Sequence, residues 1–300
     1  MGSDALPPTL AATHLLRRRG GVLVLLRRGW EDVLPVDRML AGEPLQAWGR
    51  PVPHTLAGRG DVHVLDTARG EIVAKQLLRG GVVGGFLRTW FADARRPLRE
   101  AAAAERLALS GCRTPPIVAA RVRRSWFGLC RIETATPREA GAVDLLSALR
   151  DPAGRGVLAA AAGRTLRAAH AAGLHHRDLQ AKNLLVPAGF PGPGGASDPE
   201  PLVILDLDRC RVDPPLSSLD KLAALARLGR SLVKHRLLPR ARGDTTSSSL
   251  WATRAFIRAY GSLDDERPGG TFAMVAEAVR RGVARHLPFW SDDAEIVLES

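Results

Sequence analysis

The sequence contains few cysteines and no long hydrophobic segment. Its 300 residues include three cysteines, Cys112, Cys130 and Cys210. An odd number without metal-ligand spacing argues against a disulfide framework or a zinc site and favours a reducing compartment. Purely apolar stretches such as 22–26 fall well short of the roughly 18–20 residues that span a bilayer. Residues 1–10 also lack the charged start and apolar core of a signal peptide, so we expect a cytoplasmic protein.

Aromatic residues and acidic charge are also scarce. Phe, Trp and Tyr make up 5% of the chain, and basic residues without interleaved aromatics are poor evidence for nucleic-acid binding, so no nucleic-acid partner is expected. The net charge is +12, with arginines clustered at 17–19, 27–28 and 95–96. Such a charge favours a polyanionic partner, for example an anionic lipid surface or a phosphorylated glycolipid. A solvated arginine-rich surface accounts for the same composition.

The order of the predicted elements indicates an α+β protein with two lobes. The first part is rich in strands, and residues 1–20 are expected to be poorly ordered apart from a possible short helix near 9–17. We predict strands at 22–26, 56–65, 71–78, 117–124 and 126–132, and a helix at 96–109. From about residue 140 the pattern is helical. We predict helices at 156–172, 219–238, 249–260 and 271–286, short strands at 184–186 and 202–205, and a surface loop at 187–201. The expected organisation is an N-terminal segment 1–20, a β-rich lobe 21–135 and a helical lobe 136–300.

The most informative motif is the segment His176–Asn183, which reads His-Arg-Asp-Leu-Gln-Ala-Lys-Asn. It fits the catalytic-loop pattern of kinases, in which an Asp orients the acceptor hydroxyl and an Asn five residues later reaches Mg²⁺. Asp178 is therefore the candidate base and Asn183 a candidate metal ligand, while His176 would brace the loop. A chance polar turn would rarely place these four residue types in this order.

A second acidic motif follows a short apolar strand. Residues 202–208 read Leu-Val-Ile-Leu-Asp-Leu-Asp. A carboxylate at the end of a strand suits a Mg²⁺ that bridges phosphates, so Asp206 is the second candidate metal ligand. Asp208 stands where protein kinases have glycine. An Asp-x-Asp sequence alone would also fit a helix cap or a calcium-binding turn.

The β-rich part carries candidate residues for binding phosphate groups. Gly58 and Gly60 would let backbone N–H groups approach phosphate oxygens, although a plain hairpin turn explains them as well. Lys75, on a predicted strand, could meet the α- and β-phosphates of a nucleotide, and a Glu on the next helix would orient it. Glu100 is our candidate for that role, and Glu105 on the same helix competes with it.

Taken together, these segments resemble the lipopolysaccharide kinases of the protein-kinase-like superfamily, and most resemble the 3-deoxy-D-manno-octulosonic acid (Kdo) kinases. The resemblance covers about residues 20–240 and includes the segments 75–81, 96–100, 205–209 and 225–232. It departs from protein kinases in having Gln180 in place of Lys. The sequence also contains no Ala-Pro-Glu motif.

The resemblance implies a two-lobed kinase that uses ATP and Mg²⁺ to phosphorylate a sugar hydroxyl of the lipopolysaccharide inner core, at the cytoplasmic face of the inner membrane. Its expected partners are ATP, the Kdo–lipid A acceptor and an anionic membrane surface. Alternatives are a heptose kinase, another small-molecule or protein phosphotransferase of the same fold, and a non-catalytic pseudokinase that binds ATP without turnover.

Overall fold

The computed structural model describes most of the chain. The described residues are 6–51, 62–78, 88–192, 195, 200–238, 247–261, 263 and 270–286. They divide into two compact units. The first draws on Met1–Arg106, Pro115–Ala140 and Leu207–Arg209, and the second on Leu107–Thr114, Gly141–Asp206 and Cys210–Ser300. No helix in the described part of the chain is long and apolar enough to cross a membrane.

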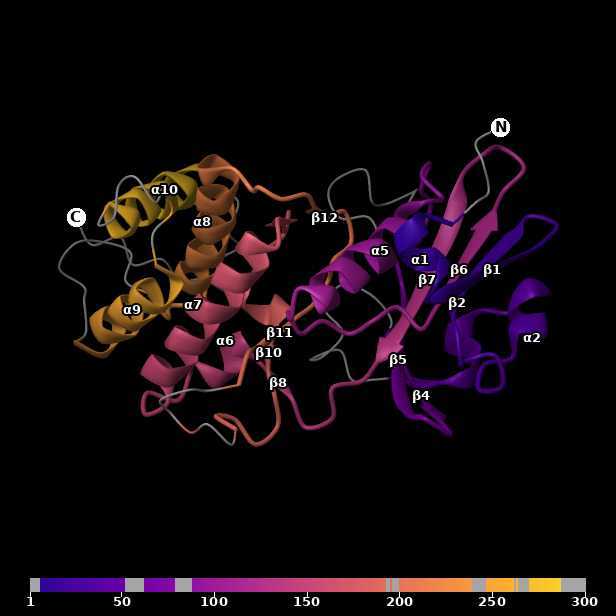
Figure 1. Cartoon of the computed structure of the whole chain (residues 1–300), viewed down its shortest axis with the longest axis horizontal. Helices are drawn as coiled ribbons and strands as arrows, with labels where there is room; N and C mark the ends of the chain where they lie inside the picture. The colour runs from indigo at the N-terminus through magenta and orange to yellow at the C-terminus, as the bar shows by residue number, and fades with distance from the viewer. Residues whose placement is uncertain are drawn as a thin grey trace. The chain divides into compact units, whose positions relative to one another are not determined.

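The first unit is built on a seven-stranded sheet in which every neighbouring pair is antiparallel (Figure 1). Its spatial order is β1-β2-β6-β7-β5-β4-β3. The strands are β1 (His14–Arg19), β2 (Val22–Arg27), β3 (Arg50–Pro51), β4 (Val62–Thr67), β5 (Gly70–Gln76), β6 (Ala119–Arg124) and β7 (Cys130–Pro137). The helices of this part are α1 (Pro8–Ala11), α2 (Val36–Leu40), the 3₁₀ turn η1 (Leu45–Trp48) and α5 (Arg96–Leu109).

Apolar side chains cover both faces of this sheet. Along β2, Val22, Val24 and Leu26 pack with a cluster that includes Met39 of α2 and Leu45 of η1. The intervening residue Leu25 points to the opposite face and packs with Ala101 of α5. This alternation follows from the two-residue period of a strand. Strand β2 is therefore covered on both faces, and β5, which carries Lys75, belongs to the same sheet.

Helix α5 has the bounds expected from its sequence. It is rich in alanine, Pro97 lies in its first turn, and Gly111 adopts a φ of +77° just after its end. Strands β4 and β5 form the predicted hairpin around 66–70. Residues 56–61 of that hairpin, and with them Gly58 and Gly60, lie outside the described residues.

Two expectations for the first unit are wrong. In the N-terminal segment the possible short helix near 9–17 corresponds to α1 at 8–11, but residues 14–19 form the unexpected strand β1. Leu10 is fully buried, and the buried His14 bonds through Nε2 to the Ile117 carbonyl oxygen at 2.9 Å. The run of arginines at 17–19 hides this strand in the sequence. The strand expected at 126–132 begins only at Cys130, because 125–129 form a turn in which Gly128 has a φ of +84°.

The second unit is mainly helical, with short strand pairs. Its helices are α6 (Leu145–Ala148), α7 (Arg155–Ala171), the 3₁₀ turn η2 (Ala181–Asn183), α8 (Ser218–Lys234), α9 (Ser247–Tyr260) and α10 (Thr271–His286). Its strands are β8 (Val143–Asp144), β9 (Leu174–His175), β10 (Leu184–Val186), β11 (Val203–Ile204) and β12 (Arg211–Val212). The four long predicted helices and the strands at 184–186 and 203–204 are present, and the α+β class is confirmed.

Helices α7 and α9 lie in close contact. A Cβ atom at Gly163 would come within 2.5 Å of the Phe256 carbonyl oxygen, so only glycine allows this approach. Deeper in the contact, His170 Nδ1 and Tyr260 Oη are 2.7 Å apart, and both residues are buried. Burial lowers the pKa of His170 to about 4, so the imidazole stays neutral at physiological pH. Helix α7 leads directly into the segment that carries the candidate catalytic residues.

Candidate active site

The predicted catalytic loop follows α7 after a sharp turn. Gly173 has a φ of +86°, and a Cβ atom there would lie 2.3 Å from the Pro214 nitrogen, so this turn requires glycine. The chain then forms β9, the loop 176–180 and η2 before entering β10. Strand β9 pairs with β12, and β10 pairs with β8 and β11. The loop thus connects a two-stranded sheet to a three-stranded sheet of the second unit.

The His176 side chain stabilises this loop through two hydrogen bonds to the backbone. Its ring is buried, Nε2 lies 3.0 Å from the Leu205 carbonyl oxygen, and Nδ1 lies 3.3 Å from the backbone nitrogen of Asp178. A carbonyl can only accept, so Nε2 carries the proton and Nδ1 accepts from the Asp178 N–H. Burial lowers the pKa of His176, which keeps it in this neutral form. The imidazole links the backbone at Asp178 to the backbone at Leu205.

The side chains around Asp178 leave its carboxylate exposed but oriented. Gln180 Nε2 donates to Asp178 Oδ1 at 2.7 Å, and Asn183 Nδ2 donates to the Asp178 carbonyl oxygen at 2.8 Å. Asn183 is buried, and its backbone oxygen accepts from the Leu205 N–H at 2.8 Å. With its amide nitrogen used in this way, the amide oxygen of Asn183 is the atom that would be available to a metal ion.

Asp206 comes directly after Leu205, whose N–H bonds to the Asn183 carbonyl oxygen. It lies two residues after β11 with a φ of +59°, a left-handed conformation that Asp tolerates better than most residues. Asn183 and Asp206 supply amide and carboxylate oxygens, the hard donors that Mg²⁺ prefers, and Mg²⁺ usually takes its other ligands from phosphate and water. The described residues contain no group of three or more His, Cys, Asp or Glu side chains suited to a metal. Two oxygen donors such as those of Asn183 and Asp206 would suit Mg²⁺.

In the first unit, Lys75 of β5 and Glu100 of α5 form the predicted pair. Their Nζ and Oε1 atoms are 4.0 Å apart, and the Glu100 side chain is 5% exposed against 33% for Lys75. The competing residue Glu105 instead pairs with Arg27. Lys75 is thus directed by a buried carboxylate, while its own ammonium group remains partly accessible.

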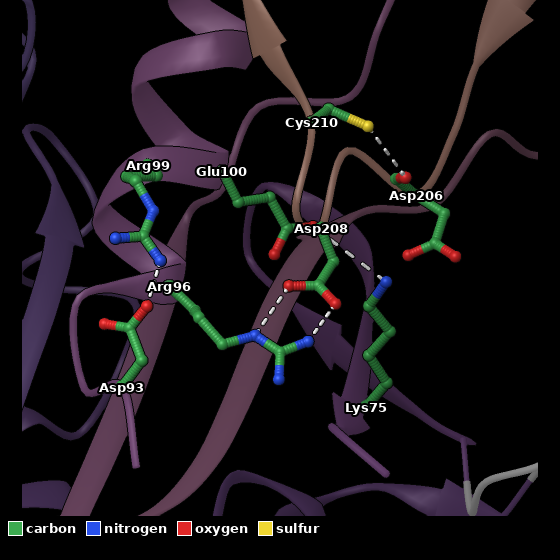
Figure 2. A network of polar contacts seen from close by, with 8 residues as sticks. All are labelled: Lys75, Asp93, Arg96, Arg99, Glu100, Asp206, Asp208 and Cys210. Atoms are coloured by element: carbon green, nitrogen blue, oxygen red, sulfur yellow. Dashed lines mark hydrogen bonds and ion pairs between the residues drawn. The ribbon is translucent and has the colours of Figure 1, made fainter. Parts of the chain in front are cut away.

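A second ion pair in the same unit was not predicted. Both Arg96 Nε and Nη2 donate to the carboxylate of Asp208, with Nε at 3.0 Å from Oδ1 (Figure 2). The guanidinium group also lies 4.3 Å from the centre of the Phe91 ring. The two side chains are only 13% and 17% exposed, so the pair is shielded from water. The carboxylate of Asp208 therefore binds an arginine of α5.

The backbone on either side of Asp208 has an unfavourable conformation, which the ion pair with Arg96 can help to stabilise. Asp206 and Arg209 both have a positive φ, +59° and +62°, and each such conformation costs about 1–3 kcal/mol for a residue other than glycine. These two residues flank Leu207 and Asp208. The two hydrogen bonds from the Arg96 guanidinium group to Asp208 hold the segment after Asp206 against α5, the helix that carries Glu100.

An open cavity of about 460 Å³ lies between α8 and α10 of the second unit. Apolar residues that line it include Leu222, Ala226 and Ala278, and its basic lining residues are Arg227, Arg230, Arg281 and Arg285. Burial lowers the pKa of Arg230, and so does the charge of Arg227, while the carboxylate of Asp178 tends to raise it. Helix α8 also contacts the catalytic loop directly, because Ser231 Oγ accepts from the Ala181 N–H at 3.3 Å.

Comparison with known proteins agrees with this arrangement. Residues 48–260 match the Lipopolysaccharide kinase (Kdo/WaaP) family. The chain belongs to this family. A 3-deoxy-D-manno-octulosonic acid kinase of Xanthomonas axonopodis pv. citri is 31% identical over 221 residues, which cover 72% of this chain and 83% of the relative. A protein of the same name from Vibrio cholerae is 27% identical, over 59% of this chain and 72% of its own.

The fold agrees with the same family. The solved structure of WaaP in complex with acyl carrier protein is similar with a TM-score of 0.52 and 22% identity, over 92% of this chain and 99% of that one. The predicted protein-kinase-like fold is confirmed, and so is the membership of a kinase family of lipopolysaccharide biosynthesis. The Kdo/WaaP kinase described here therefore brings Lys75 together with Glu100 in one unit, and Asp178 with Asn183 in the other.

Proposed function

We propose that this Kdo/WaaP kinase transfers the γ-phosphate of ATP to a sugar hydroxyl of the lipopolysaccharide inner core, specifically on Kdo of Kdo–lipid A. The observation that carries the proposal is the loop in which Asn183 and Gln180 orient Asp178 while His176 fixes the backbone. The curated relatives named as Kdo kinases support the choice of acceptor.

Each candidate residue has one role in this reaction. Asp178 accepts the proton of the sugar hydroxyl as its oxygen attacks the γ-phosphorus, and the bond between that phosphorus and the β,γ-bridging oxygen breaks, releasing ADP. Lys75, directed by Glu100, neutralises charge on the α- and β-phosphates. Asn183 and Asp206 would hold Mg²⁺, which would neutralise charge on the β- and γ-phosphates. The predicted contribution of Gly58 and Gly60 to phosphate binding belongs to the same proposal.

The deciding experiment is transfer of labelled phosphate from ATP·Mg²⁺ to purified Kdo–lipid A. Labelled glycolipid is the expected product. Transfer only to a heptose-containing acceptor would replace the Kdo assignment by a heptose kinase. ATP binding without transfer to any inner-core acceptor would contradict the proposed reaction and favour a pseudokinase.

The arginine-lined cavity between α8 and α10 suits the acceptor. Kdo is an acid, and two guanidinium groups can bind a carboxylate or phosphate with paired hydrogen bonds. Arg227 and Arg230 form no hydrogen bond or ion pair with another described side chain, unlike Arg281, which is bonded to Glu277 at 2.7 Å. The charge of Asp178 tends to raise the pKa of Arg230 and the charge of Arg227 tends to lower that of His176, which supports a position of these arginines near the catalytic loop. We therefore assign acceptor binding to Arg227 and Arg230.

The double variant Arg227→Gln/Arg230→Gln is expected to raise the KM for the acceptor by about 10-fold or more, because hydrogen bonds to charged groups contribute roughly 1.5–3 kcal/mol each. The KM for ATP should not change. Steady-state kinetics with each substrate varied in turn separates the two constants. Arg280→Gln is the matched control, since Arg280 lies on α10, does not line the cavity and is bonded to Glu277. A variant with an unchanged acceptor KM would remove these arginines from the acceptor site.

The Arg96–Asp208 pair should matter for Mg²⁺ use. In Arg96→Leu the carboxylate of Asp208 loses the paired hydrogen bonds from Arg96 in a largely buried position, and the segment after Asp206 loses this contact with α5. We expect a higher Mg²⁺ concentration for half-maximal activity, by about 5-fold or more, the equivalent of roughly 1 kcal/mol in the placement of Asp206. Arg96→Lys keeps the positive charge but cannot form the paired hydrogen bonds, so its Mg²⁺ concentration for half-maximal activity should lie between those of wild type and Arg96→Leu.

The neighbouring Arg99–Asp93 pair provides the control for this prediction. Arg99 lies on the same helix, Asp93 lies just before it, and the two side chains are far more exposed, at 58% and 44% (Figure 2). Exposed ion pairs contribute little, so Arg99→Leu should leave the Mg²⁺ dependence unchanged. Equal effects of Arg96→Leu and Arg99→Leu would mean that the Arg96–Asp208 pair has no specific role in placing Asp206.

A further inference from the structure

Two hairpin turns of the first unit lie side by side at one end of its sheet. Gly20 and Gly21 connect β1 to β2, and residues 125–129 connect β6 to β7. The two turns are joined by a hydrogen bond from the Arg124 N–H to the Gly21 carbonyl oxygen at 2.8 Å, next to the β2–β6 pairing (Figure 1). Together with the adjacent residues 88–90, we call this end of the sheet the arginine–aromatic tip.

The tip exposes large aromatic side chains on a well-defined turn. Trp126 is 94% exposed and Phe127 is 54% exposed. Ser125 closes the turn with bonds from its N–H and its hydroxyl to the Leu129 carbonyl oxygen, at 2.7 and 2.9 Å. The Phe127 ring packs on Trp90 with centroids 5.7 Å apart. Because these contacts fix the conformation of the turn, the exposure of Trp126 and Phe127 is a defined feature of the fold.

The charge of the tip has one sign. Segments 17–24, 88–90 and 123–131 contain no Asp or Glu. Their arginines are Arg17, Arg18, Arg19, Arg88, Arg123, Arg124 and Arg131, and all are exposed. The pairing register places Arg19 opposite Val22, Val22 opposite Arg123, and Arg123 opposite Arg131.

This register creates a row of like charges. Residues that are directly opposite in a sheet point to the same face, so Arg19, Arg123 and Arg131 lie along one row across four strands, with Val22 between Arg19 and Arg123. Arg123 and Arg131 are like charges directly opposite each other, which destabilises a sheet, and a bound anion would offset this repulsion. Arg131 also lies 4.6 Å from the centre of the Trp90 ring, which links the charged row to the aromatic side chains.

We propose that the arginine–aromatic tip binds the anionic surface of a phospholipid membrane. Tryptophan is enriched at the interface between lipid and water because its ring is apolar with one polar N–H, and arginines beside it bind lipid phosphate groups. Each basic residue near an anionic bilayer strengthens binding about fivefold. A protruding tip with exposed Trp and Phe fits a deformable lipid surface, whereas a globular partner would be expected to meet a concave or flat patch.

This inference deepens the proposed function, since a Kdo–lipid A acceptor lies in a membrane and the tip would hold the kinase at the cytoplasmic face of the inner membrane. It does not depend on catalysis, because binding to vesicles is measured without ATP. Failure of membrane binding is therefore distinguishable from failure of the kinase assignment.

The test is sedimentation of the full chain with vesicles of phosphatidylcholine containing 30% phosphatidylglycerol, compared with phosphatidylcholine alone. We expect binding to the anionic vesicles that weakens with salt. Trp126→Ser/Phe127→Ser and Arg19→Gln/Arg123→Gln should each weaken it by about 10-fold or more, through lost apolar and ionic contacts respectively. Phosphate transfer to a deacylated, water-soluble acceptor should be unchanged in both variants.

Matched substitutions outside the tip complete the test. Leu219→Ser removes an exposed apolar residue of α8, at 77% exposure, and Arg254→Gln/Arg258→Gln removes two exposed arginines of α9. Neither should change vesicle binding. The proposal is overturned if the protein does not bind anionic vesicles, if the tip variants bind as well as wild type, or if the tip variants instead lose a soluble protein partner while still binding vesicles.

Discussion

Replacing Asp178 with asparagine is expected to lower kcat for phosphate transfer by about 10²–10⁴-fold, the usual contribution of a positioned general base. Asparagine has nearly the same shape but cannot accept the hydroxyl proton. The bonds that orient this position come from the Gln180 side chain, the Asn183 side chain and the backbone contact with His176. Two of them involve the backbone at 178, so the loop should keep its conformation in the variant.

The affinity for ATP should be unchanged in Asp178→Asn, because Lys75 and Glu100 belong to the other unit and make their own contact. Measuring kcat together with the dissociation constant of ATP separates chemistry from binding. Asp213→Asn, at an exposed carboxylate of the same unit, is the control and should transfer phosphate normally. Wild-type kcat in Asp178→Asn would rule out proton acceptance by this residue.

The sequence predicts well those parts of the site that are local in the chain. In His176–Asn183 the bracing His, the Asp and the Asn are separated by at most seven positions, and the structure brings them together with contacts between near neighbours. The hairpin of β4 and β5 and the helix α5 also have local signals in their turn residues and alanines. Glu100 and Glu105 have equal claims as helix residues, and only the contacts of the folded chain separate them, because Glu100 lies beside Lys75 and Glu105 pairs with Arg27.

Contacts between distant segments could not be predicted in this way. Arg96 and Asp208 are 112 positions apart, and their pairing depends on the left-handed turn after Asp206. The sequence does not predict strand β1, because its three arginines are exposed and its apolar residues at 15 and 16 are too few to give a clear alternation of apolar and polar residues. The row of Arg19, Arg123 and Arg131 likewise exists only in the register of four strands.

The largest effect on stability is expected from Glu133→Leu. Glu133 accepts from Arg121 Nε and Nη2 at 3.1 and 2.6 Å, and from the Leu45 N–H at 2.9 Å. Both charged side chains are only 5% exposed. Removing one partner of a buried pair leaves an uncompensated charge and costs about 3–5 kcal/mol. We expect a correspondingly lower urea midpoint for the unfolding of the first unit, followed by the fluorescence of Trp30 and Trp48, which pack in the adjoining core.

The double variant Arg121→Met/Glu133→Leu tests whether the charge or the lost hydrogen bonds dominate. With both charges removed, only the Leu45 N–H and the Gly42 carbonyl oxygen, which accepts from Arg121, lose a partner. The double variant should therefore be more stable than Glu133→Leu by about 2 kcal/mol or more, since replacing a buried pair by apolar side chains is often neutral. If the two variants unfolded at the same urea concentration, the pair would instead act through the hydrogen bonds that fasten residues 42–45 to the sheet. In that case the cost would be set by the two backbone groups, at about 1–3 kcal/mol for each.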